Sequence, residues 1–207
     1  MRANEFIIEG RNHPVIVVDV QPEYCSYQGG AYEPVCWDVI SFVNNQTGPI
    51  LMFVNAEDTG ASVDSTAEIK AYWEENGFDP NNWQRVELVD KGYGYFRSWI
   101  DRGTDSAVII RVIREMYQQK VNDSRDLFGG EDSPEYDEKM QALMGNEYRQ
   151  FDLDDPLVVN WTSIAQLKRF NGSYIVGGGR NECLREVELL MNAFNIKYKR
   201  IDSLVYG

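Results

Sequence analysis

Three side chains suited to nucleophilic or acid–base chemistry each follow an apolar run of the sequence. Asp19 follows 15–18, Lys91 follows 85–89, and Cys183 comes after 173–176 and a glycine turn. A helix N-terminus and a nearby ammonium both favour the reactive thiolate form of a cysteine. A nearby carboxylate can accept the thiol proton and later return it to a leaving group. We therefore predict that Cys183 is a nucleophile, with Asp19 as general acid/base and Lys91 as the ammonium.

The turn before Cys183 consists of Gly177, Gly178 and Gly179. Glycine adopts backbone conformations closed to other residues and lets a substrate approach the main chain. Backbone N–H groups at a helix start can stabilise the negative charge that develops on an attacked carbonyl or imine. We expect the N–H groups of Gly179 and Cys183 to form this oxyanion hole, with Gly178 among the substrate-binding residues.

These side chains need a scaffold that brings distant segments together. Apolar strands are predicted at 15–18, 50–54, 85–89, 173–176 and 197–201, and helices at 35–43, 64–76, 106–119 and 182–194. Repeated strand–helix units indicate a parallel sheet covered by helices on both faces. Ligands of such sheets bind beyond the C-terminal strand ends, at a topological switch point. The predicted fold class is α/β, a three-layer α/β/α arrangement with a Rossmann-like parallel sheet.

The length of the chain suits a single α/β domain covering residues 1–207. The stretch 101–156 fits that domain least well, because it combines helical segments with an acidic, glycine-containing piece and no clear strand. Insertions of this length form lids, interfaces or mobile surface. We interpret 101–156 as an insertion into the domain.

Aromatic residues follow Lys91 closely, at Tyr93, Tyr95 and Phe96. They could line a pocket for a flat or apolar substrate, and we count them among the candidate substrate-binding residues. Aromatic side chains at this spacing belong to a hydrophobic core equally often. Both interpretations therefore stay open for these three residues and for Trp99, which comes three positions after Phe96.

Composition limits the partners. Acidic residues outnumber basic ones 33 to 20, and the formal net charge of −13 repels nucleic acid and anionic membranes. No run approaches the length of a membrane span, and the first ten residues do not resemble a signal peptide, so a cytoplasmic location is predicted. The expected partner is a small-molecule substrate, and the chain is expected to fold alone or as a homo-oligomer.

The cysteines and the single histidine narrow the chemistry further. The chain has three cysteines, Cys25, Cys36 and Cys183. An odd number without CxxC spacing favours reduced thiols over a disulfide framework or a zinc site. Cys25 and Cys36 are expected to be inert core residues. His13 precedes Pro14 and is interpreted as a solvated turn residue. Catalysis by a Cys–His or Ser–His pair is therefore not expected.

Three segments, VIVVDVQ, VELVDKGYGYF and YIVGGGRNECLREVELL, resemble in this order the isochorismatase-like cysteine hydrolase superfamily. That family has a strand ending in an Asp-x-Gln element, a strand ending in a catalytic lysine, and a glycine six residues before the nucleophile. The matching residues here are Asp19 with Gln21, Lys91, and Gly177 with Cys183. The resemblance implies a Rossmann-like three-layer fold and a thioester or related covalent intermediate, and Gln21 joins the substrate-binding candidates.

The resemblance also implies an unusual cis peptide bond, which would fall between Gly178 and Gly179. Two features depart from the family pattern. Leu184 and Arg185 follow the cysteine where the family has a small or β-branched pair, and the inserted stretch is longer than is typical. Both departures affect the substrate more than the fold or the triad.

Relatives that resemble nicotinamidases hold a metal through an aspartate and histidines after the second strand. The corresponding loop here contains Glu57 and Asp58 but no histidine. A hard cation normally needs several oxygen ligands, and these two carboxylates are interpreted as solvated. We expect neither a metal nor a cofactor.

The leading hypothesis is a metal-independent cysteine hydrolase that acts on a small amide-like or related substrate. The alternative is a non-catalytic binding or assembly protein that uses 101–156 as its interaction surface. A flavin or nucleotide binder is a third hypothesis, but the glycine turn is not GxGxxG and follows the fifth strand instead of the first.

Overall fold

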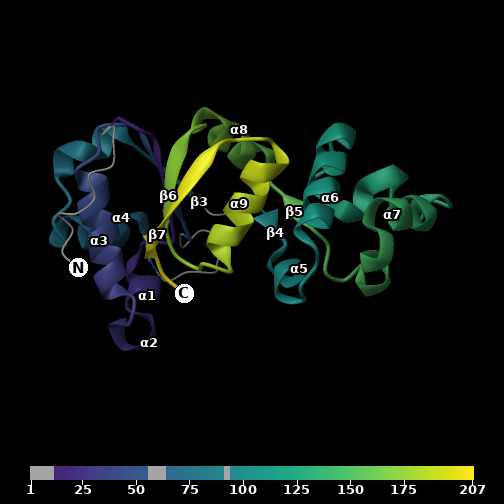
Figure 1. Ribbon diagram of the computed structural model, residues 1–207, viewed down its shortest axis with the longest axis horizontal. Helices are drawn as coiled ribbons and strands as arrows, with labels where there is room; N and C mark the ends of the chain where they lie inside the picture. The colour runs from purple at the N-terminus through teal and green to yellow at the C-terminus, as the bar shows by residue number, and fades with distance from the viewer. Residues whose placement is uncertain (1–11, 56–63, 91–93) are drawn as a thin grey trace. The chain divides into compact units, whose positions relative to one another are not determined.

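The computed structural model of the protein describes residues 12–55, 64–90 and 94–207. Its central feature is a five-stranded sheet in the order β3-β2-β1-β6-β7, in which all neighbouring strands run parallel (Figure 1). These strands are β1 (Val15–Val18), β2 (Ile50–Val54), β3 (Val86–Asp90), β6 (Ser173–Gly177) and β7 (Tyr198–Val205). The sheet is flanked by helices, which confirms the predicted α/β class and its Rossmann-like parallel sheet.

The strand order reverses between β1 and β6. From β1 the chain adds β2 and β3 on one side, and it later adds β6 and β7 on the other side. The connections that leave β1 and β6 therefore diverge, which opens a crevice at the C-terminal ends of these two strands. The register pairs Val18 with Gly177, so Asp19 and Gly178 emerge next to each other at this edge of the sheet.

The central strands are apolar because both of their faces are covered. Every residue of β1, β2 and β6 is buried, as is typical of strands inside a parallel sheet. Helices α3 (Glu33–Asn44) and α4 (Thr66–Glu75) contribute to the same hydrophobic core through fully buried side chains, among them Ile40 and Trp73. Each such side chain stabilises the fold by about 1.5–3 kcal/mol relative to an exposed position.

The sequence before α4 explains where that helix begins. The Ser65 hydroxyl accepts a hydrogen bond from the Glu68 N–H, and the Glu68 carboxylate accepts one from the Ser65 N–H at 2.7 Å. The Ser65 hydroxyl also donates to the Glu68 carboxylate at 2.7 Å. The bonds that this carboxylate accepts from the Ser65 N–H and then from the hydroxyl lower the pKa of Glu68. Further along the helix, the Trp73 indole N–H donates to the Val20 carbonyl at 2.7 Å. Helix α4 is thereby attached to the segment that follows β1.

Two short helices, α1 (Pro22–Cys25) and α2 (Tyr27–Gly30), lie between β1 and α3. A disulfide joins Cys25 to Cys36, with their Cα atoms 6.1 Å apart. The prediction that these two cysteines are reduced is therefore wrong, because the segment containing α2 folds α1 back towards α3, which the spacing of the cysteines does not reveal. Disulfides are rare in the reducing cytoplasm, and the cytoplasmic location stays a prediction.

The chain divides into two compact units. The first comprises the described parts of Met1–Lys91 together with Arg169–Leu184 and Lys197–Gly207, and it contains the five-stranded sheet. The second comprises the described part of Gly92–Lys168 and Arg185–Ile196. Helices α8 (Trp161–Arg169) and α9 (Cys183–Ala193) have residues in both units. The single domain with an insertion at 101–156 stays a prediction.

The second unit is mainly helical. A short antiparallel pair of strands, β4 (Gly94–Tyr95) and β5 (Val158–Val159), accompanies the helices. The helical elements between these strands are α5 (Arg97–Asp101), α6 (Ser106–Gln119), η4 (Ser124–Gly129), α7 (Tyr136–Met144) and η5 (Gly145–Gln150). Helix α6 has the predicted bounds, and its buried residues recur every three or four positions, as in an amphipathic helix.

The first unit also contains a short helical turn, η3 (Pro80–Arg85), directly before β3. The Arg85 guanidinium donates to the carbonyl oxygens of Gly48 and Val43 at 2.8 and 3.0 Å. Burial lowers the pKa of Arg85. These contacts fix the start of β3 beside the connection that leads into β2. Across the described ranges, no helix combines the length and apolar character that a membrane span requires.

Candidate active site

A pocket of about 420 Å³ lies in the first unit, where Asp19 follows β1 and Gly179 follows β6. This is the edge of the sheet at which the strand order reverses, as expected for a ligand site of this architecture. Its lining includes three carboxylates, those of Asp19, Glu23 and Glu182. Four phenol rings also line it, those of Tyr24, Tyr27, Tyr32 and Tyr206. Cys183 contributes its thiol, so the pocket combines a nucleophile with acidic and aromatic surroundings.

Asp19 marks the end of β1. Its N–H still donates to the Phe53 carbonyl at 3.0 Å, which continues the ladder of the sheet. Its backbone then takes a left-handed conformation with φ of 55°, which aspartate tolerates better than most residues with a side chain. The residue lines the pocket while only 2% of its surface is exposed. The strand end thus fixes a nearly buried carboxylate at the pocket.

Cys183 is the first residue of α9 and keeps a half-buried thiol outside the disulfide. The amides on its two sides, those of Glu182 and Leu184, donate to the Gly179 carbonyl at 2.7 and 3.1 Å. These bonds close a tight turn around the carbonyl and hold Cys183 at the helix start. The N–H groups at that end of a helix carry partial positive charge, which favours a thiolate.

The three glycines allow this turn for three separate steric reasons. A Cβ at Gly177 would lie 2.2 Å from the Val18 carbonyl oxygen, and one at Gly178 would lie 2.0 Å from the Tyr206 ring. Gly179 has φ of 63°, and a Cβ there would lie 3.0 Å from the Cys183 nitrogen. No peptide bond among the described residues is cis, so the bond between Gly178 and Gly179 is trans. The cis bond implied by the resemblance is therefore a wrong prediction.

Tyr206 is a pocket residue that the sequence reasoning missed. Its hydroxyl donates a short hydrogen bond to the Asp19 carbonyl oxygen, and its ring stacks on that of Tyr32 with centroids 4.9 Å apart. Burial raises the pKa of Tyr206 well above 10, and negative charge on Asp19 and Cys183 raises it further. Tyr206 directly follows β7, which extends to Val205 instead of ending at the predicted 201. A longer predicted strand would have placed Tyr206 at the same sheet edge as Asp19.

Gln21 braces the loop after β1. Its side-chain N–H groups donate to the Asn55 carbonyl and to the Asp64 carboxylate, both at 3.0 Å, and its oxygen accepts from the Asn55 N–H at 2.8 Å. The same Asp64 oxygen accepts from the Glu23 N–H at 2.8 Å. These bonds tie the segment after β1 to the segment after β2. Gln21 is fully buried, and its amide positions the pocket wall that carries Glu23.

The remaining candidates occupy different surroundings. Lys91 and Tyr93 lie outside the described residues, and their proposed roles stay predictions. Tyr95 belongs to β4, where its backbone pairs with Val158. Phe96 has no exposed surface, and this burial favours the core interpretation for that residue.

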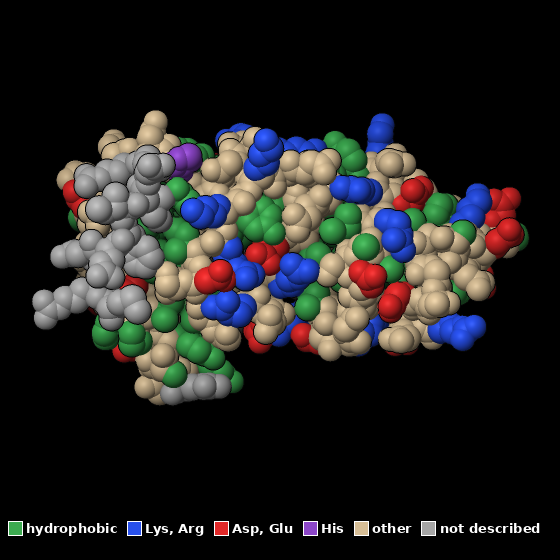
Figure 2. Space-filling model, in the orientation of Figure 1, with side chains coloured by type: hydrophobic (Ala, Val, Ile, Leu, Met, Phe, Trp, Pro, Cys, Tyr) green, Lys and Arg blue, Asp and Glu red, His purple; other side chains and the backbone are tan. Residues whose placement is uncertain are grey.

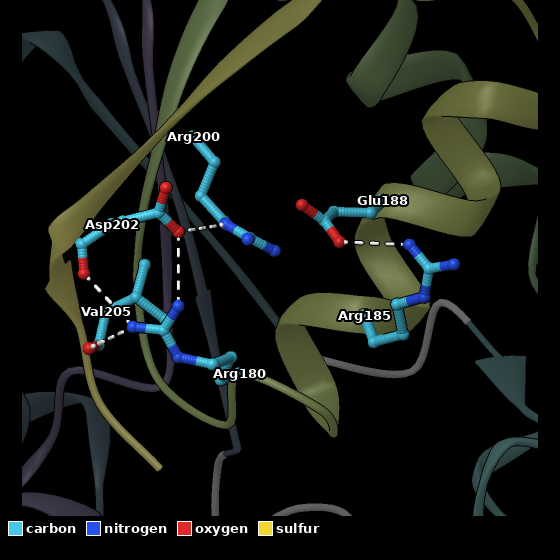
Figure 3. Close-up of polar contacts among 6 residues, drawn as sticks. All are labelled: Arg180, Arg185, Glu188, Arg200, Asp202 and Val205. Atoms are coloured by element: carbon cyan, nitrogen blue, oxygen red, sulfur yellow. Dashed lines mark hydrogen bonds and ion pairs between the residues drawn. The ribbon is translucent and has the colours of Figure 1, made fainter.

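Arg180 stands next to Gly179, and its guanidinium points towards β7 (Figure 3). It donates to the Asp202 carboxylate at 3.1 Å and to the Val205 carbonyl at 3.5 Å. Its backbone N–H donates to the Tyr206 carbonyl at 3.0 Å. Arg180 therefore fastens the glycine turn to the end of β7 and so to the residue that stacks on Tyr32.

The two residues after the cysteine have structural roles. Leu184 is fully buried. Arg185 forms an ion pair with Glu188 at 3.3 Å, one turn further along α9 (Figure 3), and donates to the Ser106 hydroxyl at 2.8 Å. The departure from the family pattern at these positions is therefore accommodated by packing and pairing along the helix.

The described side chains contain no group of three or more His, Cys, Asp and Glu residues arranged to hold an ion, and the absence of a metal stays a prediction. Glu57 and Asp58, the two carboxylates weighed as hard-cation ligands, lie outside the described ranges. The thiol and carboxylate of the pocket are suited to nucleophilic and acid–base chemistry.

Comparisons with known proteins leave the family open. No family model, no curated protein and no solved structure matches the chain. The resemblance to isochorismatase-like cysteine hydrolases therefore rests on its three short motifs. The parallel sheet is common to many Rossmann-like proteins and does not by itself define a function.

Proposed function

We propose that the protein is a metal-independent cysteine hydrolase that cleaves a small amide-like C–N or related bond through a covalent thiol intermediate. One observation carries the proposal: Asp19 and Cys183, far apart in the sequence, line the same pocket at the ends of adjacent strands. A thiol that lies at a helix N-terminus and shares a pocket with a carboxylate has what nucleophilic catalysis needs.

The first half of the reaction forms the intermediate. Asp19 accepts the proton of the Cys183 thiol, and the thiolate attacks the carbonyl carbon to form a C–S bond. The carbonyl oxygen takes the electron pair, and the N–H groups of Gly179 and Cys183 donate to it. The C–N bond then breaks, and Asp19 returns its proton to the departing nitrogen.

The second half regenerates the enzyme. Water attacks the thioester carbon while Asp19 accepts one of its protons. The C–S bond breaks, the carboxylic acid product leaves, and the proton on Asp19 goes back to the sulfur. Lys91, whose position lies outside the described residues, is the proposed cation that stabilises charge during both halves.

The test uses an activated ester, p-nitrophenyl acetate, because it acylates reactive thiols without a matched binding site. We expect a burst of nitrophenol, an acetyl group on Cys183 detected by mass spectrometry, and then slow turnover. Cys183→Ala is expected to abolish the burst. Asp19→Asn keeps a residue that tolerates positive φ, and it is expected to slow turnover by about 10²- to 10⁴-fold.

Two controls decide the outcome. Circular dichroism and thermal unfolding show whether each variant keeps the fold. An equal burst in Cys183→Ala excludes this cysteine as the nucleophile. If alkylation of Cys183 has the rate of an ordinary thiol and Asp19→Asn does not change it, the non-catalytic binding or assembly hypothesis is favoured instead.

A further inference from the structure

We propose that the pocket selects substrates that carry a cationic nitrogen, an ammonium or guanidinium group, and presents their carbonyl to Cys183. The inference rests on the proposed hydrolase function and names the substrate class that this function leaves open. It is carried by the joint presence of carboxylates and tyrosine rings around the thiol.

The carboxylates reach the pocket from two directions. Glu23 belongs to α1 and comes from the loop after β1, whereas Glu182 directly precedes α9 and comes from the loop after β6. Asp19, which directly follows β1, adds a third carboxylate to the lining. None of the described lining residues is Lys, Arg or His. The described lining thus carries three carboxylates and no cationic side chain, a composition that attracts a cation.

The tyrosines supply surfaces that also favour a cation. The face of a phenol ring carries negative electrostatic potential and attracts an ammonium or guanidinium within about 6 Å of its centroid. Tyr32 and Tyr206 stack at 4.9 Å with an interplanar angle of 25°, so they form a continuous aromatic wall. Tyr27 is 61% exposed, and hydrophobic side chains lie at the surface over α1 and α2 (Figure 2).

The aromatic wall is held in place before any ligand binds. The Cys25–Cys36 disulfide closes the loop that contains Tyr27 and Tyr32. Tyr24 is fixed by a hydrogen bond from the Asn55 side chain to its hydroxyl, at 2.8 Å. Rings that are already ordered lose little conformational entropy on binding, which strengthens the complex. The pocket volume of about 420 Å³ suits a small molecule.

The experiment measures how fast Cys183 reacts with three methanethiosulfonates: a cationic trimethylammonioethyl, an anionic sulfonatoethyl and a neutral methyl reagent. In each case the thiolate attacks the sulfenyl sulfur, a new S–S bond forms and methanesulfinate leaves. Mass spectrometry follows the modification at low ionic strength. Each rate is divided by that of 2-mercaptoethanol with the same reagent, and the neutral reagent corrects for the thiolate fraction.

The wild-type protein is expected to favour the cationic over the anionic reagent by about ten-fold or more. A net charge of −13 attracts any cation. The variants therefore decide whether the preference arises from the pocket itself. Glu23→Gln and Glu182→Gln are each expected to lower the ratio about three-fold. Tyr27→Leu is expected to slow the cationic reagent about two- to five-fold without affecting the neutral one. Glu75→Gln removes the same charge from the exposed end of α4, and is expected to leave the ratio unchanged.

The inference fails if Glu23→Gln and Glu182→Gln change the ratio no more than Glu75→Gln does. That result is distinct from failure of the proposed function. Suppose that Cys183 reacts rapidly with the neutral reagent, that this rate depends on Asp19, and that the local carboxylates do not affect the charge preference. The proposed hydrolase function is then retained and the proposed cationic substrate is rejected. If Cys183 instead discriminates by charge but has the reactivity of an ordinary thiol, independent of Asp19, the hydrolase function is rejected. The pocket is then a cation-binding pocket without this catalytic activity.

Discussion

The two walls of the pocket are built by opposite means. The wall after β1 is held by side chains: the Gln21 hydrogen bonds, the Asp64 carboxylate and the Cys25–Cys36 disulfide. The wall after β6 depends mainly on close approaches that only glycine permits, of the Val18 carbonyl to Gly177 and of the Tyr206 ring to Gly178, and the Arg180 side chain adds a tie to β7. Several independent contacts hold the first wall, so the loss of one leaves the others in place. The second wall requires space next to its glycines, and one added methyl group would fill that space.

The largest effect is expected for Gly177→Ala. The new Cβ meets the Val18 carbonyl oxygen at 2.2 Å at a backbone φ of 106°, so neither backbone can yield without disturbing the sheet. We expect a loss of about 4 kcal/mol in the free energy of unfolding, measured by urea denaturation. Gly77→Ala is the matched control: its φ is 93° with nothing within 4 Å, and it is expected to cost only about 1 kcal/mol. Equal losses would show that φ strain alone, without the clash, explains the effect.

Reduction of the Cys25–Cys36 disulfide is expected to have the next largest effect. The bond closes a loop between residues 11 positions apart, and the entropy of that loop in the unfolded chain corresponds to about 3 kcal/mol. Urea denaturation of Cys183→Ala with and without dithiothreitol measures it, and the background variant prevents thiol exchange. An unchanged midpoint would mean that side-chain contacts alone hold the first wall.

Gln21→Leu tests the hydrogen-bonded part of the first wall. The substitution keeps a side chain of similar size and removes three hydrogen bonds to Asn55 and Asp64. We expect a loss of about 2 kcal/mol, because buried polar partners lose their bonds. Gln46→Leu provides the comparison: Gln46 is also buried, but its side-chain oxygen accepts no hydrogen bond from the described residues. A loss at Gln46 as large as that at Gln21 would attribute both to packing.

The smallest effect is expected for Tyr206→Phe, which changes the residue that contacts both walls. It removes the hydrogen bond to Asp19 while keeping the ring on Gly178, and we expect a loss of about 1 kcal/mol at neutral pH.

The same residue gives a pH dependence. Because burial raises the folded-state pKa of Tyr206 above that of the unfolded chain, the unfolded state loses this proton first as the pH rises. The stability contribution is complete below about pH 10 and declines above it. Tyr206→Phe should therefore flatten the alkaline decline in the free energy of unfolding. An unchanged decline would assign it to other groups, such as Tyr72, whose pKa burial raises to about 12.

Much of the sheet could be predicted from the sequence because its strands are continuous apolar runs. The predicted bounds 15–18 and 50–54 are those of β1 and β2. Helix α6 was equally clear because its apolar positions follow the helical period. Strands β4 and β5 have two residues each, too few for any periodicity to show, and α8 was not foreseen.

The site was only partly predictable for a different reason. Asp19, Gly179 and Cys183 could be placed together because strand ends of a parallel sheet meet at one edge. The disulfide and the stacking of Tyr32 on Tyr206 depend on how a loop folds back on itself, which no local pattern encodes. The end of β7 was missed because Asp202 and Ser203 interrupt its alternation before Leu204 and Val205.

The contact between Tyr206 and Asp19 has a consequence for the order of folding. It joins residues 187 positions apart, and contacts of such separation form late because the chain must close a very long loop first. The pocket around this contact is therefore expected to assemble late in folding, together with the pairing of β1 and β6, which joins Val18 to Gly177 across a similarly long stretch of chain. A chain caught before that stage would carry Cys183 without the Tyr206–Asp19 contact that completes its pocket.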